Sequence, residues 1–180
     1  MPWILLALAV LLASTLGVEF VRGLRTYRKY RGKRIITCPE TRRDAAVRVA
    51  AAKAAVVAAT GIPHIQLSDC SRWPERQDCG QDCLAQIKGD PNGCLVQTIV
   101  TRWYAGQSCV ACQKPIGKIN WHEHPPALAD EQQKTVQWNE IPIEKLQETF
   151  ATHWPMCWDC HIAQTFRREH AELVTDRPPH

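Results

Sequence analysis

Two short stretches, Cys109-Val110-Ala111-Cys112 and Cys157-Trp158-Asp159-Cys160, decide how the carboxyl half of this 180-residue chain folds. Each stretch places two cysteines three positions apart, and 44 residues separate the two pairs. A two-residue gap lets one tight turn present both sulfur atoms to one ion, and two such turns complete a tetrahedral shell. The spacing therefore predicts a zinc site whose four ligands are Cys109, Cys112, Cys157 and Cys160.

The segments around the two pairs differ. Cys112 is followed by a turn, whereas the residues after Cys160 have the apolar spacing of a helix. Between the pairs, Lys118-Ile119-Asn120-Trp121 and Thr135-Val136-Gln137-Trp138 predict two strands of a hairpin, each with a tryptophan that packs under the metal. The order of knuckle, hairpin and helix resembles the treble-clef group of zinc fingers over residues 106–173. The resemblance implies that both cysteine pairs are zinc ligands, but it implies no activity because treble clefs serve many functions.

The helix predicted at the second pair also has a chemical role. Cys157 and Cys160 would lie in its first turn, where free N–H groups and the positive end of the helix dipole stabilise thiolates. Along the same helix we expect Ile162, Phe166 and Leu173 to face the core.

The segment between the two cysteine pairs is longer than the corresponding segment of the treble-clef pattern. It contains His122-Glu123-His124 ahead of two prolines, a composition typical of an exposed loop. Imidazole is also a zinc ligand, so the sequence leaves open whether His122 or His124 replaces one of the cysteines.

Two other chemistries fit parts of this pattern. Cys157-Trp158-Asp159-Cys160-His161 has the form of a c-type haem attachment sequence, with His161 as proximal ligand, which would make the chain a periplasmic electron carrier. The motif lies only about 20 residues from the end and leaves seven cysteines unexplained, so we favour zinc. A redox dithiol at Cys109 and Cys112 lacks the preceding strand and following long helix of thioredoxin-like sites.

Five cysteines precede this region at irregular spacing. We expect residues 77–87 to form a short helix in which Cys79 and Cys83, four positions apart, share one face. With Cys38 in a proline-containing turn and Cys70 at a strand end, they predict a second zinc site that leaves Cys94 spare. An iron-sulfur cluster would use the same thiolates, and burial as small apolar residues is the alternative without metal.

Residues 1–21 predict a transmembrane anchor, because residues 3–18 are all apolar or small. A cleaved signal peptide would carry positive charge before the apolar stretch and a small-residue cleavage site after it. Neither is present, so we favour an anchor that stays attached.

The juxtamembrane residues 22–34 contain seven Lys and Arg without an acidic neighbour. Positive charge marks the cytoplasmic side of a membrane helix, so we expect the rest of the chain on the cytoplasmic face of the inner membrane with its thiols reduced. The same charges would pair with anionic lipid headgroups. From residue 35 onward 15 Lys and Arg face 17 Asp and Glu, which argues against nucleic-acid binding.

The remaining patterns predict an α+β fold, in which one amino-terminal transmembrane helix precedes a small cysteine-rich, metal-stabilised domain of short hairpins and helices. Strands are expected at residues 35–37, 46–49 and 65–67, and helices at residues 50–59 and 95–103. We divide the chain into a first cysteine-containing α+β module at residues 35–105, a zinc module at residues 106–174 and a frayed tail at residues 175–180.

The function indicated by these features is that of a membrane-anchored zinc-binding protein, with one or two zinc ions, that acts as a protein-interaction or assembly module. A nucleophile, base and orienting acid cannot be assembled from the sequence, so we do not expect an enzyme. The alternative is a membrane-anchored electron-transfer protein that carries haem c or an iron-sulfur cluster.

Overall fold

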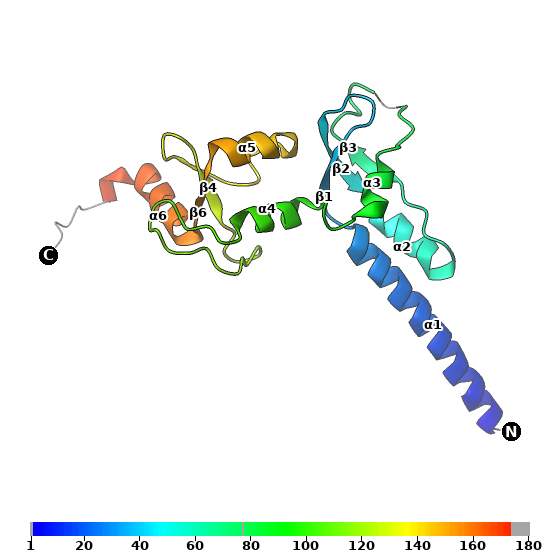
Figure 1. Cartoon of the computed structure of the whole chain (residues 1–180). Coiled ribbons are helices and arrows are strands. Elements are labelled where there is room, and N and C mark those ends of the chain that lie inside the picture. Colours follow the sequence, from blue (N-terminus) through cyan, green and yellow to red (C-terminus); the bar gives the residue numbers. More distant parts are fainter. Residues whose placement is uncertain (1, 77, 174–180) are drawn as a thin grey trace. The chain divides into compact units, whose positions relative to one another are not determined.

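The computed structural model describes residues 2–76 and 78–173 and has mixed helix and sheet, as predicted. The chain forms two compact units, and the division falls between Thr98 and Ile99 (Figure 1). The predicted tail at residues 175–180 lies outside the described residues.

The amino-terminal helix α1 (Pro2–Tyr30) confirms the predicted apolar helix and extends it into the basic stretch as far as Tyr30. At 29 residues it is about 43 Å long, and its length and apolar composition suffice to cross a membrane. Ser14 and Thr15 donate their hydroxyls to the carbonyls of Leu11 and Leu12, so these polar groups are satisfied within the helix itself.

The first unit is built on an antiparallel sheet in the order β1-β2-β3, formed by β1 (Lys33–Thr37), β2 (Asp44–Val49) and β3 (Leu67–Cys70). The β1–β2 hairpin confirms the strands predicted there. Alternate residues Ala45, Val47 and Val49 of β2 are buried, which is the period of a half-buried strand. The third strand starts at Leu67, so its predicted position was two residues early.

Helix α2 (Ala51–Thr60) confirms the predicted alanine-rich helix. It packs against α1, where Ala59 lies near Gly23. Ala54 and Ala58 of α2 are buried. A Cβ added at Gly23 of α1 would lie 3.2 Å from the carbonyl oxygen of Ala55, so glycine permits the close approach of the two helices.

The predicted helix at residues 77–87 was wrong over most of its length. The observed α3 (Leu84–Gly89) begins after Cys83, and Cys79 lies in irregular chain before it. Gln81 adopts a left-handed conformation with φ 58°, and its side-chain oxygen accepts a hydrogen bond from the backbone N–H of Leu67. This conformation interrupts a helix, so Cys79 and Cys83 do not share a helical face.

Helix α4 (Val96–Tyr104), close to the helix predicted there, crosses the division between the units, and the second unit contains a sheet in the order β5-β4-β6. Its strands are β4 (Ala127–Ala129), β5 (Thr135–Val136) and β6 (Trp154–Met156). Between β5 and β6 lie a short 3-10 helix η1 (Ile143–Lys145) and α5 (Leu146–Thr152). Helix α6 (Trp158–Glu169) and a 3-10 turn η2 (Ala171–Leu173) complete the described chain.

The predicted pairing of residues 118–121 with residues 135–138 was also wrong. Strand β5 pairs with β4, while Asn120 turns the chain by accepting the backbone N–H groups of His122 and Glu123 on its side-chain oxygen. A short polar side chain that bonds nearby backbone favours a turn over a strand.

The two tryptophans predicted to pack under the metal lie elsewhere. Trp138 joins a cluster of rings with Trp103, Tyr104 and Phe150, and its Nε1 donates to the Tyr104 hydroxyl at 3.1 Å. Trp121 donates its Nε1 to Thr101.

The apolar face predicted for α6 does not point into the core. Ile162, Phe166 and Leu173 are 45%, 47% and 62% exposed, whereas His161 of α6 is buried. The helix therefore presents apolar side chains on its outer surface.

The buried side chain of Arg34 connects α1 to the sheet of the first unit. Its guanidinium donates to the carbonyls of Lys29 and Tyr30, the last two residues of α1, both at 2.6 Å. It also bonds the carbonyls of Arg31, Gly32 and Pro91. Arg34 thus caps the carboxyl end of α1 and differs from the other six basic residues of the juxtamembrane stretch, which are exposed.

Replacing this cap should destabilise the first unit. We expect Arg34→Met to lower the free energy of unfolding by about 3 kcal/mol, because several buried carbonyls lose their donor. Thermal unfolding of the full chain in detergent measures the effect. Arg48→Met, at an exposed position of β2, is the matched control and should leave the unfolding temperature within error. Equal stability of the two variants would contradict the capping role.

Candidate metal centre

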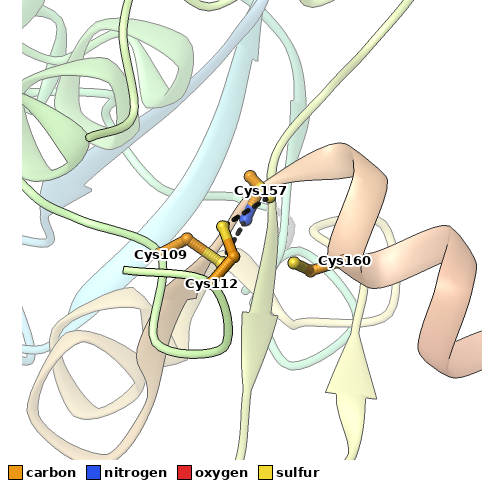
Figure 2. Close-up of side chains that lie close together, drawn as sticks. All are labelled: Cys109, Cys112, Cys157 and Cys160. Carbon is orange, nitrogen blue, oxygen red and sulfur yellow. Dashed lines mark hydrogen bonds between the residues drawn. The ribbon is translucent and has the colours of Figure 1, made fainter. Parts of the chain in front are cut away.

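Four cysteines of the second unit converge on one point. Their Sγ atoms all lie within 4.8 Å of one another. Figure 2 shows that one pair comes from the loop after α4 and the other from the start of α6. The cluster consists of Cys109, Cys112, Cys157 and Cys160, the quartet that the spacing predicts.

A tight turn holds the first pair. The N–H of Cys109 donates to the carbonyl of Lys114 at 2.9 Å, and the N–H of Gln113 donates back to the carbonyl of Cys109 at 2.9 Å. Gln113 closes the turn in a left-handed conformation with φ 60°. The N–H of Val110 donates to the carbonyl of Pro155, which fixes the turn beside β6.

The second pair is placed by α6. Cys157 is the N-cap residue of this helix, and its carbonyl accepts the N–H of His161 at 3.0 Å. Cys160 follows in the first turn, as predicted, so the two sulfur atoms face the same side. The backbone N–H of Cys157 also donates to the Sγ of Cys109 at 3.3 Å, which ties the two pairs together.

The four thiols differ in their readiness to ionise. Burial alone would raise the pKa of Cys109, but the N–H groups of Cys157, Cys112 and Ala111 stabilise its thiolate and lower that pKa to about 7. The pKa of Cys160 is raised, mainly by burial and further by interactions with the neighbouring sulfur atoms. Ionising all four thiols together would need a cation to balance their charge.

The separation of the sulfur atoms suits a single small ion. In a tetrahedron with metal–sulfur bonds of about 2.3 Å the sulfur atoms are about 3.8 Å apart. The Sγ atoms of Cys112 and Cys157 are 3.9 Å apart. The residues present therefore fit one metal ion with four thiolate ligands. His122 and His124, which the sequence left open as ligands, are exposed and are not members of the cluster.

His161 follows the second pair and belongs to the interior of the unit. It is 3% exposed, and its Nε2 lies 3.1 Å from the side-chain amide nitrogen of Gln137. Burial lowers the pKa of His161, which favours the neutral imidazole.

The first unit brings its four candidate ligands to the lining of one cavity of about 40 Å³. These residues are Cys38, Cys70, Cys79 and Cys83. Among the described residues they are not found as a group that could hold a metal ion, so the second zinc site stays a prediction. Cys94 does not line this cavity, and its thiol lies 3.9 Å from the carbonyl of Gln86.

Sequence reasoning missed Arg72 at this cavity. Its Nη1 donates to the Sγ of Cys38 at 3.2 Å and to the hydroxyl of Thr41 at 3.0 Å. The contact joins residues 34 positions apart, so no local pattern could have indicated it.

Comparison of the chain with protein families, curated proteins and solved structures finds no match.

Proposed function

We propose that this chain is a membrane-anchored zinc protein whose treble-clef-like second unit binds another protein on the cytoplasmic face of the membrane. The observation that carries the proposal is the convergence of four Sγ atoms within 4.8 Å in a chain that begins with a helix able to cross a membrane. Thiolate sets of this kind select zinc, and their binding energy stabilises small domains.

Two features favour a zinc ion over the alternatives with iron. In a cluster of several iron atoms, cysteine sulfurs on different irons lie farther apart than those around a single ion, and the four Sγ atoms here all lie within 4.8 Å of one another. For haem c, both thiols of the second pair would bond a porphyrin and His161 would ligate its iron. Instead the second pair faces the first pair, and His161 is buried against Gln137.

The packing of α1 supports an anchor that stays attached. The last turns of α1 belong to the first unit, where Tyr30 is buried in the core and Gly23 lies against Ala55 of α2. Removal of the helix through this region would expose that core. The exposed basic residues after the apolar stretch favour a cytoplasmic location of both units.

The surface of α6 supports a role in binding. Ile162 and Phe166, four positions apart, form an apolar stripe that is nearly half exposed. Exposed apolar side chains on a rigid element beside a metal-stabilised turn suit a protein partner. We therefore propose an interaction or assembly role without catalysis.

The first test is the metal itself. The purified full chain should be colourless and contain zinc, whereas a Soret band would indicate haem and broad brown absorption an iron-sulfur cluster. Cys112→Ser should hold about one zinc ion fewer per chain after equilibration with a chelator, because an exposed ligand is lost without disturbing the core. Cys94→Ser is the control and should retain the metal content of the unsubstituted protein. Unchanged zinc in Cys112→Ser would contradict the assignment.

Membrane topology gives the second test. Alkaline phosphatase fused after Leu173 should be inactive in a bacterial cell, because the enzyme needs an oxidising compartment, whereas a fluorescent protein fused there should be bright. An amino-terminal epitope tag should remain on the full-length chain in the membrane fraction. An active phosphatase fusion would overturn the cytoplasmic orientation, and loss of the tag would overturn the uncleaved anchor.

The partner surface gives the third test. A photoreactive phenylalanine analogue at Phe166 should give a discrete crosslinked band in the native cell. The same analogue at Arg167, which is exposed on the neighbouring face, should not. Adding Ile162→Asp should abolish the band while the zinc content stays unchanged, because an apolar contact is replaced by a charge. Equal crosslinking at both positions would contradict a specific apolar surface.

A further inference from the structure

The turn at Cys38 in the first unit has the same backbone form as the turn that holds Cys109. The N–H of Cys38 donates to the carbonyl of Arg43 at 2.8 Å, and the N–H of Arg42 donates to the carbonyl of Cys38 at 2.8 Å. Gln113 and Lys114 make the corresponding bonds with Cys109, both at 2.9 Å. The two turns therefore share one hydrogen-bond pattern around a cysteine.

Their other features agree position by position. The residue four after each cysteine is left-handed, with φ 56° at Arg42 and 60° at Gln113. The residue before each cysteine pairs with the residue six after it, as Thr37 does with Asp44 and Ser108 with Pro115. A left-handed conformation at a non-glycine residue is uncommon, so its recurrence at the same place marks one specific turn.

The sulfur atoms of the two turns have matching surroundings. The backbone N–H groups two and three positions later point at each sulfur, from Glu40 and Thr41 at Cys38 and from Ala111 and Cys112 at Cys109. Other donors differ between the turns: the hydroxyl of Thr41 and the guanidinium of Arg72 also bond the sulfur of Cys38, whereas the N–H of Cys157 bonds the sulfur of Cys109. The difference is Thr41, which stands where the other turn has its second cysteine.

The thiols missing from this turn come from elsewhere in the first unit. Cys70 ends β3 and Cys83 precedes α3, and both are buried, while Cys79 lies in the chain between them. All three line the same cavity of about 40 Å³ as Cys38. Burial raises the pKa of Cys83 to about 11, and the nearby thiols of Cys70, Cys79 and Cys38 add to this effect.

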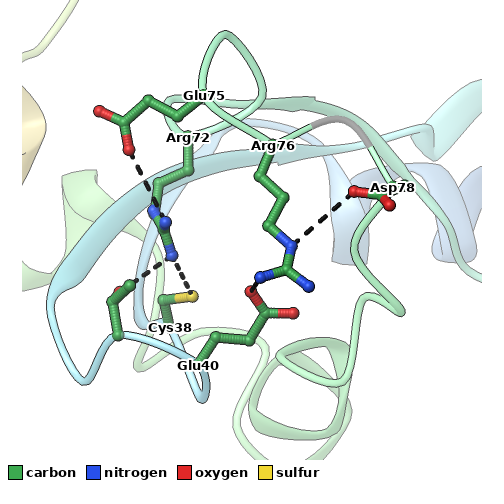
Figure 3. A network of polar contacts seen from close by, with 7 residues as sticks. Cys38, Glu40, Arg72, Glu75, Arg76 and Asp78 are labelled. Atoms are coloured by element: carbon green, nitrogen blue, oxygen red, sulfur yellow. Dashed lines mark hydrogen bonds and ion pairs between the residues drawn. The ribbon is translucent and has the colours of Figure 1, made fainter.

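Two guanidinium groups that pair with carboxylates lie beside this cavity. Figure 3 shows the guanidinium of Arg72 pointing at the sulfur of Cys38, with Glu75 bound to the same side chain at 3.7 Å. Arg76, which also lines the cavity, pairs with Glu40 at 3.4 Å. A cation bound by four thiolates keeps a net charge near −2, which the guanidinium of Arg72 at the sulfur of Cys38 would offset in part.

We propose that the first unit holds a second, independent zinc ion, bound by the thiolates of Cys38, Cys70, Cys79 and Cys83, with the Cys38 turn acting as a one-cysteine version of the Cys109 turn. Binding draws the four sulfur atoms inward from the cavity wall and releases the thiol protons to solvent. Arg72 continues to donate to the bound sulfur of Cys38 and offsets the charge of the site.

Metal analysis of the full chain in detergent tests the proposal, because each site can be removed separately. After equilibration with a chelator, the unsubstituted protein and Cys94→Ser should hold about two zinc ions per chain. The double variant Cys112→Ser with Cys160→Ser should hold about one, and so should Cys38→Ser with Cys83→Ser. One zinc in the unsubstituted protein and none in the Cys112 and Cys160 variant would overturn the second site and leave the quartet in place.

Loss of zinc from the Cys38 and Cys83 variant alone distinguishes this proposal from the proposed function. One zinc that disappears only from the Cys38 and Cys83 variant would overturn the quartet and support the first-unit site. If that variant fails to fold, Co²⁺ added to the Cys112 and Cys160 variant decides the matter, because one tetrahedral thiolate centre should give visible absorption. Absence of that absorption overturns the proposal. Rapid alkylation of Cys38 in the zinc-loaded protein, as expected for a free reactive thiolate, would overturn it as well.

Discussion

Repulsion between thiolates of like charge decides whether the two cysteine pairs of the second unit can lie together in their ionised form. Four sulfur atoms within 4.8 Å can all be ionised only around a cation, so the turn at Cys109 and the start of α6 are stable together when a metal neutralises them. The apolar residues beside the cluster are few and mostly small, including Ala127, Ala129 and Met156. Metal ligation would add to the stability of this small group of residues.

Local spacing was sufficient to predict the quartet. A pair of cysteines three positions apart shares one turn, and the apolar period after Cys160 indicated a helix that begins at the second pair. The same local logic predicted α2, α4 and the first hairpin. Local spacing could not show which strand pairs with β5. The partner is β4, a fully buried strand that lies between β5 and β6, and this pairing depends on contacts between residues far apart in the sequence.

Several of the failures have one physical cause, which is a polar side chain that bonds the backbone. Asn120 turned a predicted strand, and the left-handed Gln81, bonded to Leu67, interrupted a predicted helix. In the sequence, Arg34 is one of seven basic residues that all suggest an exposed position. Its role as a cap of α1 becomes visible only once the end of that helix is known. The likeness of the Cys38 and Cys109 turns was also hidden, because Thr41 removes the second cysteine from the pattern.

The continuity of α1 restricts how the first unit can move. A single helix runs from Pro2 to Tyr30 without a break, packs against α2 at Gly23 and is fastened at its end by Arg34. A chain joined to its anchor by a flexible linker would swivel freely above a bilayer. If the apolar part of α1 spans a membrane, its rotation or tilting would be transmitted directly to the sheet, and the first unit would keep a fixed orientation relative to that helix.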